Sequence, residues 1–165
     1  MTKLIGAPFE GGCACGGVRF AMTSGPMFIH CCHCTWCQRE TGSAFALNAL
    51  IETARLDLLK GAPMVVPTPS ASGKGQKILR CPECRVALWS HYPGAGEAIA
   101  FMRVGTLDGR AHFKPDIHIF TSTKLPWVVI PPDVAAVEEY YSAQEHWPAA
   151  SLERRRAAAA QAPKR

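Results

Sequence analysis

The 165-residue sequence contains no apolar run that approaches the roughly 20 residues of a membrane-spanning helix. Aromatic residues are also sparse, at 8% of the chain, and no tandem repeat is present. The first ten residues hold a single lysine and no apolar segment, so no secretory signal peptide is expected. These absences predict a soluble, cytoplasmic protein without a membrane partner.

Positive charge is modest, with a formal net charge of +5. Part of it lies in the C-terminal tail, at Arg154, Arg155, Arg156, Lys164 and Arg165. No basic stretch interleaved with aromatic residues accompanies the cysteines, as a nucleic-acid-binding module would require. The sequence therefore argues against nucleic acid as a partner, and it leaves the oligomeric state open.

Thirteen prolines and 14 glycines divide the chain into short segments, which favours a β-rich fold over a helical bundle. Strands are predicted at residues 18–22, 27–31, 45–51, 56–59, 77–80, 86–90, 99–104 and 117–120. The segment 63–75, rich in proline, serine and glycine, is expected to be a loop. Two prolines followed by Asp133, a favourable N-cap residue, predict a helix to about His146. The expected fold is mainly β, with short antiparallel strands and a C-terminal helix.

Domain organisation is predicted to be simple. Residues 1–148 are expected to form a single domain, because their length suits one core and no linker interrupts them. Residues 149–165 are rich in alanine and arginine and show no core-facing pattern. The sequence leaves both a frayed helix and a disordered tail open for this segment.

Eight cysteines are the dominant feature of the composition. A secreted domain could use them as four disulfides, but these cysteines are clustered at metal-ligand spacings rather than scattered. Disulfides within Cys-x-Cys or between adjacent cysteines are strained. Thiolate sulfur is a preferred ligand of zinc, so the pattern predicts zinc sites.

The first cysteine set joins two distant parts of the chain. Cys13 and Cys15 are two residues apart, so in an extended segment both sulfurs point to the same side. Cys81 and Cys84 form a Cys-Pro-Glu-Cys knuckle, in which two thiolates converge on one ion. Together the four cysteines make a tetrahedral donor set, which is the arrangement of a closed, structural zinc site. The alternative is that each pair serves separately or stays as free thiols.

The second set, within Cys31-Cys32-His33-Cys34-Thr35-Trp36-Cys37, has a less certain register. Cys34 and Cys37 form a second knuckle, whose third ligand could be Cys31, Cys32, His30 or His33. If residues 28–34 are extended, Cys32 and Cys34 share one side while Cys31 and His33 face the other. We therefore predict Cys32, Cys34 and Cys37 as the ligands. Three protein ligands leave a fourth position for water or substrate, as in a catalytic zinc site.

The alternative is a second closed zinc site with a fourth protein ligand. Its candidates are His30, His33, Cys31, His91, His112, His118 and His146. An open site would favour an enzyme, whereas a closed one would favour a module that binds a protein partner. Thiol redox exchange through Cys34 and Cys37 is a weaker alternative, because the βαβ context of that motif is missing.

These motifs together resemble a known family, the glutathione-dependent formaldehyde-activating enzyme / centromere protein V (GFA) family. The resemblance covers about residues 10–130. It is carried by Gly12-Cys13-Ala14-Cys15-Gly16, by the run from Cys32 to Ser43, by Cys81-Pro82-Glu83-Cys84, by Gly105-Thr106-Leu107-Asp108, by His118-Ile119-Phe120 and by Lys124-Leu125-Pro126-Trp127. Arg85 departs from the pattern, since it stands where the family usually has glycine.

The resemblance implies a β-tent-like fold that binds two zinc ions (Zn²⁺). By position, Cys13, Cys15, Cys81 and Cys84 would hold the structural ion, and Cys32, Cys34 and Cys37 the ion linked to catalysis. The implied function resembles that of S-(hydroxymethyl)glutathione synthase, a carbon–sulfur lyase that adds the thiol of glutathione to formaldehyde. The expected partners are a small thiol, such as glutathione, and a small aldehyde. A non-catalytic zinc module or a small-thiol carrier is the alternative, and the sequence leaves the physiological thiol and aldehyde open.

A few further residues have two readings. The tryptophans Trp36, Trp89 and Trp127 could line a substrate cleft, but core packing is the stronger expectation for them. Lys124 and Arg39 could meet a carboxylate of glutathione, although solvated surface charge is the default for each. Asp108, after a Gly-Thr-Leu segment, is expected to support a turn.

Overall fold

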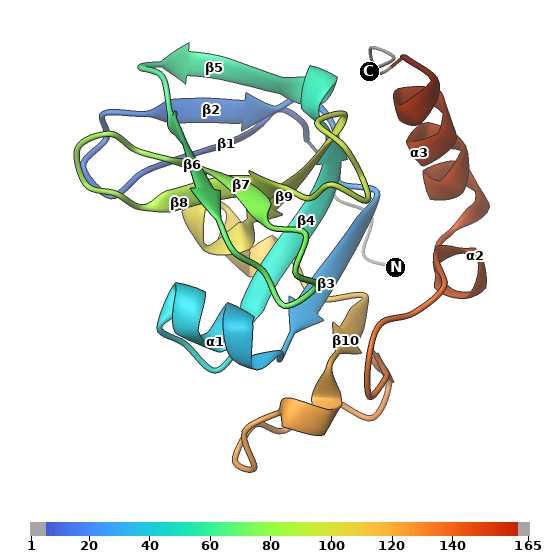
Figure 1. Cartoon of the computed structure of the whole chain (residues 1–165). Coiled ribbons are helices and arrows are strands. Elements are labelled where there is room, and N and C mark those ends of the chain that lie inside the picture. Colours follow the sequence, from blue (N-terminus) through green and yellow to red (C-terminus); the bar gives the residue numbers. More distant parts are fainter. Residues whose placement is uncertain (1–5, 162–165) are drawn as a thin grey trace.

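The fold consists of two β-sheets and a C-terminal helical segment in a computed structural model that describes residues 6–161 (Figure 1). The strands are β1 Phe9–Gly12, β2 Arg19–Met22, β3 Phe28–Cys32, β4 Ala46–Glu52, β5 Leu56–Lys60, β6 Met64–Thr68, β7 Gln76–Arg80, β8 Ala87–His91, β9 Ile99–Arg103, β10 Ile117–Ile119 and β11 Ala135–Ala136. The α-helices are α1 Thr35–Thr41, α2 Ala143–His146 and α3 Ala149–Gln161. Short 3-10 helices lie at Thr53–Arg55, Val104–Thr106, Arg110–His112 and Thr121–Thr123.

The larger sheet has the strand order β11-β10-β3-β4-β9-β8-β7-β6, and the smaller sheet has the order β1-β2-β5. All pairings are antiparallel except those of β10, which runs parallel to both β3 and β11. Strands β3 and β4 are buried along almost their whole length, in agreement with their near-continuous apolar sequences. The prediction of a mainly β fold is confirmed.

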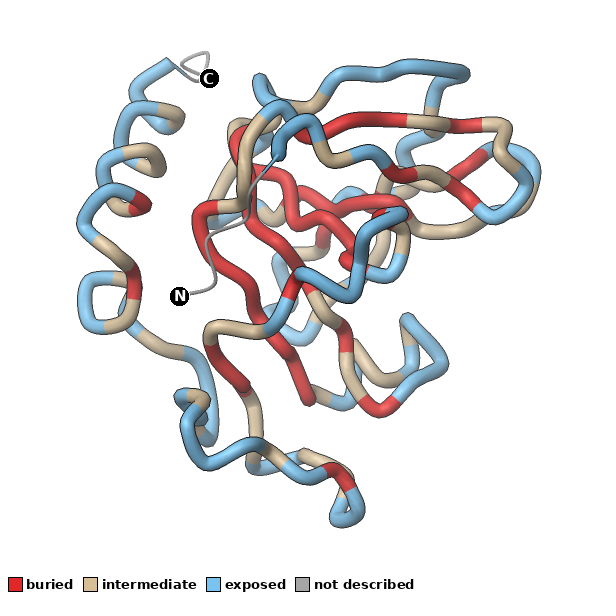
Figure 2. The backbone as a smooth tube through the Cα atoms, turned by 180° about the vertical axis from the view of Figure 1, so that it is seen from behind, coloured by how far each residue is buried: buried red, intermediate tan, exposed pale blue. Residues whose placement is uncertain are grey.

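Two apolar clusters form the core, and each contains part of one cysteine set. One lies around Phe20, Met102 and Leu88 and includes Cys13 and Cys81. The other is built from large apolar and aromatic side chains and includes Cys32. Figure 2 shows the buried residues concentrated in the central strands and the exposed ones along the loops and the C-terminal helix.

All eight predicted strands are present within about one residue of their expected ends. They correspond to β2, β3, β4, β5, β7, β8, β9 and β10. The predicted loop at 63–75 is partly wrong, because its first residues form the edge strand β6, which pairs with β7 from Met64 to Thr68. Pro67 is tolerated there because an edge strand can leave one backbone N–H position unpaired.

The predicted helix from Asp133 to His146 is wrong over most of its length. Residues 135–136 form β11, and the backbone N–H of Val137 donates to the His118 carbonyl at 3.0 Å. The N–H of Phe120 donates to the Glu139 carbonyl at 3.1 Å, so the pairing continues beyond β11. Only Ala143–His146 are helical. The free edge of β10 supplies backbone partners to this segment, and that long-range pairing outweighs the local N-cap signal.

Helix α3 occupies the described part of the C-terminal tail and is anchored by polar contacts. The Ser151 hydroxyl donates to the Met27 carbonyl at 2.7 Å. The guanidinium of Arg154 donates to both carboxylate oxygens of Glu52, at 2.8 and 2.6 Å, and to the Gly25 carbonyl at 3.0 Å. These contacts explain why the helix has no apolar stripe in its sequence. The division of the chain at residue 148 stays a prediction.

In the part of the chain that the structure describes, no helix combines the length and apolarity needed to cross a membrane.

Candidate metal centres and the adjoining pocket

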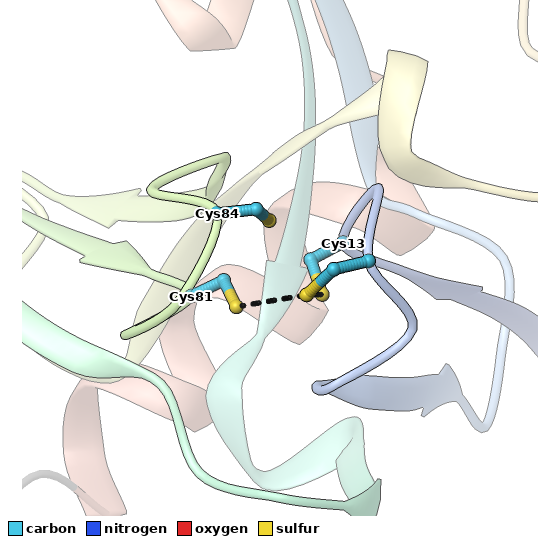
Figure 3. Close-up of side chains that lie close together, drawn as sticks. Cys13, Cys81 and Cys84 are labelled. Carbon is cyan, nitrogen blue, oxygen red and sulfur yellow. Dashed lines mark hydrogen bonds between the residues drawn. The ribbon is translucent and has the colours of Figure 1, made fainter.

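The first cysteine cluster lies where the segment after β1 meets the turn between β7 and β8. Cys13 and Cys15 come from the former, and Cys81 and Cys84 from the latter. The four sulfurs all lie within 4.8 Å of one another. Figure 3 shows Cys13, Cys81 and Cys84 pointing into one space from these two segments. The structure thus brings together all four residues of the predicted set.

The spacing of these sulfurs fits a zinc ion. The Sγ atoms of Cys13 and Cys15 are 3.4 Å apart, and those of Cys15 and Cys81 are 3.7 Å apart. Four thiolates placed about 2.3 Å from a tetrahedral zinc have sulfurs roughly 3.8 Å apart. All eight cysteines are free thiols, so no disulfide competes for them. Gly17 lies close to this cluster. A Cβ atom at this position would lie 3.3 Å from the Cys15 sulfur, so the absence of a side chain leaves room for that thiol.

Backbone N–H groups favour the thiolate form at this cluster. The N–H of Val18 donates to the Cys13 sulfur at 3.2 Å. The N–H of Val86 lowers the pKa of the Cys84 thiol to about 6. Arg85 adopts a left-handed φ of 62°, and its N–H donates to the Cys81 carbonyl at 3.1 Å. The turn therefore requires a left-handed backbone conformation at position 85. Glycine adopts this conformation readily, but here an arginine adopts it.

The second cluster lies at the junction of β3 and α1. Cys32 ends β3, Cys34 is the N-cap of α1, and Cys37 lies in its first turn. The backbone N–H of Cys37 donates to the Cys34 sulfur at 3.4 Å. All three sulfurs lie within 4.8 Å of one another. The structure brings together the three cysteines predicted from strand alternation, whereas their role as zinc ligands stays a prediction.

No fourth protein ligand joins these three sulfurs among residues 6–161, where only Cys32, Cys34 and Cys37 form this group. The candidates on the neighbouring strand positions have other partners. His30 shares a hydrogen bond with the Tyr141 hydroxyl, and Nδ1 of His91 lies 2.9 Å from the Ile99 carbonyl. The described residues therefore leave the three-sulfur cluster with room for a further ligand.

Cys31 and His33 form a separate, buried group with His118 of β10. The Cys31 sulfur lies 3.6 Å from Nε2 of His33, which lies 2.8 Å from Nδ1 of His118. Burial raises the pKa of the Cys31 thiol to about 12, and the charge of nearby Cys37 adds to this effect. Burial, helped by nearby His118 and Lys124, lowers the pKa of His33 to about 4. These groups are therefore neutral at physiological pH.

A pocket of about 560 Å³ adjoins the three-sulfur cluster. Cys32, Cys34 and Cys37 all lie in its lining. The other lining residues come from the β6–β7 connection, the central strands, residues 92–95 and the C-terminal segment 140–155. Its volume falls within the range of small-molecule sites and is large enough for a tripeptide thiol. In the four-sulfur cluster, Cys84 lines a second pocket of about 680 Å³, whereas Cys13, Cys15 and Cys81 line neither of these two pockets.

One side of this pocket carries a buried ion network. The Glu40 carboxylate pairs with both Arg80 and Arg103, and Nη2 of Arg103 lies 2.8 Å from it. Nη1 of Arg103 donates to the Asn48 side-chain oxygen at 2.6 Å. Nε of Arg103 is buried and has no partner among the described residues. Arg103 therefore offers one free N–H donor in a partly neutralised setting near the sulfurs.

The remaining predicted site residues lie in different parts of the structure. Trp36 lines the pocket, Trp89 is buried against Phe20, and Trp127 is 70% exposed, so only Trp36 could serve a ligand there. Lys124 and Arg39 do not line the pocket, and the Lys124 ammonium donates to the Val128 carbonyl at 2.7 Å.

Asp108 accepts hydrogen bonds from Arg19 at 3.0 and 2.6 Å, and its backbone N–H donates to the Glu10 carbonyl. It therefore supports local structure, which agrees with the expectation of a turn role.

Several residues of the pocket lining were not predicted from the sequence, above all Tyr140, Tyr141 and Trp147. Their aromatic character was visible, but a helix from Asp133 would have spread them around its axis. The signal that could have indicated their role is the pair of adjacent tyrosines and the nearby tryptophan, which follow an extended segment. Only the return of the chain along β10 directs them towards the cysteines.

Comparisons with known proteins agree with the cysteine arrangement. The model of the family described as glutathione-dependent formaldehyde-activating enzyme matches residues 8–123. No curated protein matches the chain. A crystal structure of a Rhodobacter sphaeroides protein, a structural genomics target, is similar with 19% identity and a TM-score of 0.46. The similarity covers 61% of this chain and 88% of that one, and at this level it carries no argument.

Proposed function

The chain belongs to the glutathione-dependent formaldehyde-activating enzyme family, and we propose that it is a zinc-dependent, carbon–sulfur lyase-like enzyme. In this proposal it adds the thiol of glutathione, or of a similar small molecule, to formaldehyde or another small aldehyde. The observation that carries the proposal is the position of Cys32, Cys34 and Cys37 in the lining of a 560 Å³ pocket.

Proteins of this family bind zinc, and the chain has cysteine clusters that could hold it. We propose two ions per chain. The four-sulfur cluster has the complete donor set of a structural site, so Cys13, Cys15, Cys81 and Cys84 would close around one ion. Cys32, Cys34 and Cys37 would hold the other and leave a position for a ligand. A zinc ion bound there would lower the pKa of a substrate thiol and so raise its thiolate fraction.

The chain's own groups account for the rest of the proposed reaction. The pocket would hold the thiol and the aldehyde side by side, which turns a bimolecular encounter into a local one. A carbon–sulfur bond forms as the carbonyl π bond breaks, and the thiol proton ends on the former carbonyl oxygen. Arg103 lines the pocket, so its guanidinium is a candidate to bind that oxygen or a substrate carboxylate.

The test is exchange NMR of glutathione and formaldehyde with and without the zinc-loaded protein. Thiols add to formaldehyde rapidly without help, so the measured quantity must be the increase in exchange rate over the uncatalysed reaction. We expect a rate increase at substoichiometric protein that Cys34→Ser removes. Cys31→Ser is the matched control, since Cys31 lies outside the three-sulfur group. No rate increase at stoichiometric protein would end the enzyme proposal.

The second candidate function is non-catalytic, either a zinc module for a protein partner or a small-thiol carrier. The zinc module requires a fourth protein ligand beside Cys32, Cys34 and Cys37. Among residues 6–161, no further histidine, cysteine or carboxylate side chain belongs to this group. A carrier would bind glutathione stoichiometrically without raising the exchange rate. Isothermal titration with glutathione, read beside the exchange experiment, separates the carrier from the enzyme.

A cytoplasmic location is part of the proposal. All eight cysteines are free in the structure, and free thiols persist in a reducing compartment. Glutathione is abundant under the same conditions, which suits the proposed reaction.

A further inference from the structure

The pocket beside the three-sulfur cluster has two chemically different walls. One wall is the β6–β7 connection, which contributes Ser70, Ser72 and Lys74 and is polar. The other is the C-terminal segment, which contributes the aromatic side chains of Tyr140, Tyr141 and Trp147. The same segment also contributes Arg155, whose guanidinium lies over the Trp147 ring, 5.5 Å from its centroid. We call these three aromatic residues the aromatic wall.

The aromatic wall is held together by specific contacts. The indole N–H of Trp147 donates to the Tyr141 hydroxyl at 2.7 Å, and that hydroxyl also bonds with His30. The Trp147 ring stacks on Phe28 with centroids 5.3 Å apart. The ring of Tyr140 stacks on Tyr141 at 5.2 Å. These contacts engage the polar groups of Tyr141 and Trp147 inside the wall, so the three rings offer a preformed aromatic surface, with Arg155 over the Trp147 ring.

The exposure of the wall differs from residue to residue. Trp147 is 7% exposed, so it serves as the base of the wall. Tyr140 is 59% exposed although it lines the pocket and has aromatic neighbours. A large exposed aromatic side chain beside a pocket is suited to contact with a ligand, because burying it removes apolar surface from water.

Formaldehyde does not account for this wall. It has two heavy atoms and would fill a small fraction of the 560 Å³ pocket. The charged body of a glutathione-like thiol is matched by the polar wall and by Arg155, rather than by stacked aromatic rings. In addition, all three aromatic wall residues lie beyond residue 123, where the match to the family ends. The wall is therefore an addition to the part of the chain that carries the shared cysteine motifs.

We propose that the aldehyde substrate carries an aromatic or large apolar substituent that packs against the aromatic wall. The inference rests on the proposed function and names its substrate class. The polar body of the thiol lies along the β6–β7 connection, and the carbonyl carbon lies between the walls, beside the three sulfurs. The product is a hemithioacetal: a C–S bond forms, the C=O π bond breaks, and the thiol proton moves to oxygen.

The test compares 3-phenylpropanal with propanal, each mixed with glutathione and the zinc-loaded full-length protein. The two aldehydes share the same reacting carbon and differ by the ring. Exchange NMR gives the catalysed rate per protein molecule at substrate concentrations below saturation. We expect 3-phenylpropanal to exceed propanal by about tenfold or more, the factor that burial of one aromatic ring supports.

Two variants locate the effect. Tyr140→Ala should lower the ratio of the two rates towards one, because it removes the exposed ring of the wall. Trp127→Ala is the control, since Trp127 is an exposed aromatic residue outside the pocket lining. It should leave the ratio unchanged. An unchanged ratio in Tyr140→Ala would overturn the assignment to the aromatic wall.

A second measurement needs no variant and no reaction. Saturation-transfer NMR with the unreactive alcohol 3-phenylpropan-1-ol, with propan-1-ol as control, reports ring contact in the wild-type protein. Stronger transfer to the phenyl protons, together with the rate preference, supports the proposal. Acceleration of formaldehyde and propanal without any preference for the ring would overturn the inference alone. Absence of acceleration with every aldehyde would overturn the proposed function as well.

Discussion

The two cysteine clusters of this chain differ in donor number, in the elements that supply them and in their surroundings. The first draws four sulfurs from the segment after β1 and from the β7–β8 turn, 66 residues apart between Cys15 and Cys81. The second draws three sulfurs from one short segment that ends β3 and begins α1. Cys13 and Cys81 belong to one apolar cluster, and Cys32 belongs to the other.

These differences are the basis of our proposal that the first cluster stabilises the fold and the second takes part in the reaction. A metal at the first cluster would close a long loop and join the small sheet to the large one, so its binding energy would act on stability. The second cluster closes only a local turn, so a metal there would add little to the fold. All three of its sulfurs line a pocket, whereas only Cys84 of the first cluster does so in the second pocket, and a ligand can therefore reach the three-sulfur cluster. Complete ligation stabilises, whereas incomplete ligation beside a cavity permits reaction.

The largest effect is expected for Cys81→Ser. Cys81 is fully buried and supplies the sulfur that reaches across to Cys15. Losing the first metal removes a contribution of about 10 kcal/mol or more, as for structural zinc in small domains. We expect the variant to be insoluble or to melt at least about 15 °C below the wild type. Thermal melting and zinc analysis check this, with Cys31→Ala as a buried cysteine control that keeps both metals.

The second largest effect should appear in Cys34→Ser, and in activity rather than stability. We expect the zinc content to fall from two ions to one and the catalysed exchange to disappear. The melting temperature should drop by only a few degrees, because the first cluster remains complete. A variant that retained two ions, or that unfolded like Cys81→Ser, would contradict the division of roles between the clusters.

Metal removal should occur in two phases. With three protein ligands and an adjoining pocket, the second metal should leave first when the protein is exposed to excess chelator. The four-sulfur cluster should release its metal much more slowly and together with unfolding. A metallochromic dye and circular dichroism, followed in parallel, give the two time courses. Simultaneous release of both metals, with loss of the fold, would remove the predicted asymmetry.

A smaller effect is expected at the α3 anchor, which lies outside both clusters. Arg154→Met breaks the paired hydrogen bonds to Glu52 and should lower the free energy of unfolding by about 1–2 kcal/mol. Arg156→Met is the control, since the Arg156 side chain donates to the Leu152 carbonyl of the same helix. Denaturant unfolding followed by circular dichroism compares the two variants. A loss in Arg156→Met as large as in Arg154→Met would contradict the anchor.

The α3 anchor should also be sensitive to acid. Burial acts to raise the pKa of Glu52, but the Arg154 hydrogen bonds prevail and lower it below its ordinary value of 4.5. Because the folded pKa is the lower one, the stabilisation is fully present above the ordinary value and is lost as pH falls through the folded pKa. The stability difference between wild type and Arg154→Met should therefore shrink below about pH 4.5. A difference independent of pH would show that the ion pair is not its source.

The smallest effect is expected for Arg85→Gly. Arg85 has a φ of 62°, a conformation that costs a residue with a side chain about 1 kcal/mol relative to glycine. Relief of this strain is partly offset by the greater entropy of glycine in the unfolded chain. We expect a rise of about 1–3 °C in melting temperature with unchanged zinc content. A lower melting temperature would indicate that the side chain itself stabilises the turn.

The strands were largely predictable from sequence, and the C-terminal segment was not. Apolar runs between turn residues located β3 and β4, because both strands are buried and their local pattern agrees with their environment. Asp133 after two prolines carried a local helix signal, but pairing with β10 prevailed there. The local sequence around Asp133 does not indicate that this segment pairs with the distant strand β10. For that reason the helix prediction failed.

The same contrast holds for the candidate site. Spacing determined the local pairs, because residues two apart in an extended chain share a side and Cys-x-x-Cys residues converge. The contact of Cys15 with Cys81, 66 residues further along the chain, depends on the tertiary structure. The sequence also separated Cys31 and His33 from Cys32 and Cys34 by alternation. The tertiary structure alone decided that Cys31 and His33 meet His118, and that Tyr140 and Trp147 face the three-sulfur cluster. Ligand spacing is a local property of the backbone, whereas a pocket depends on contacts between distant segments.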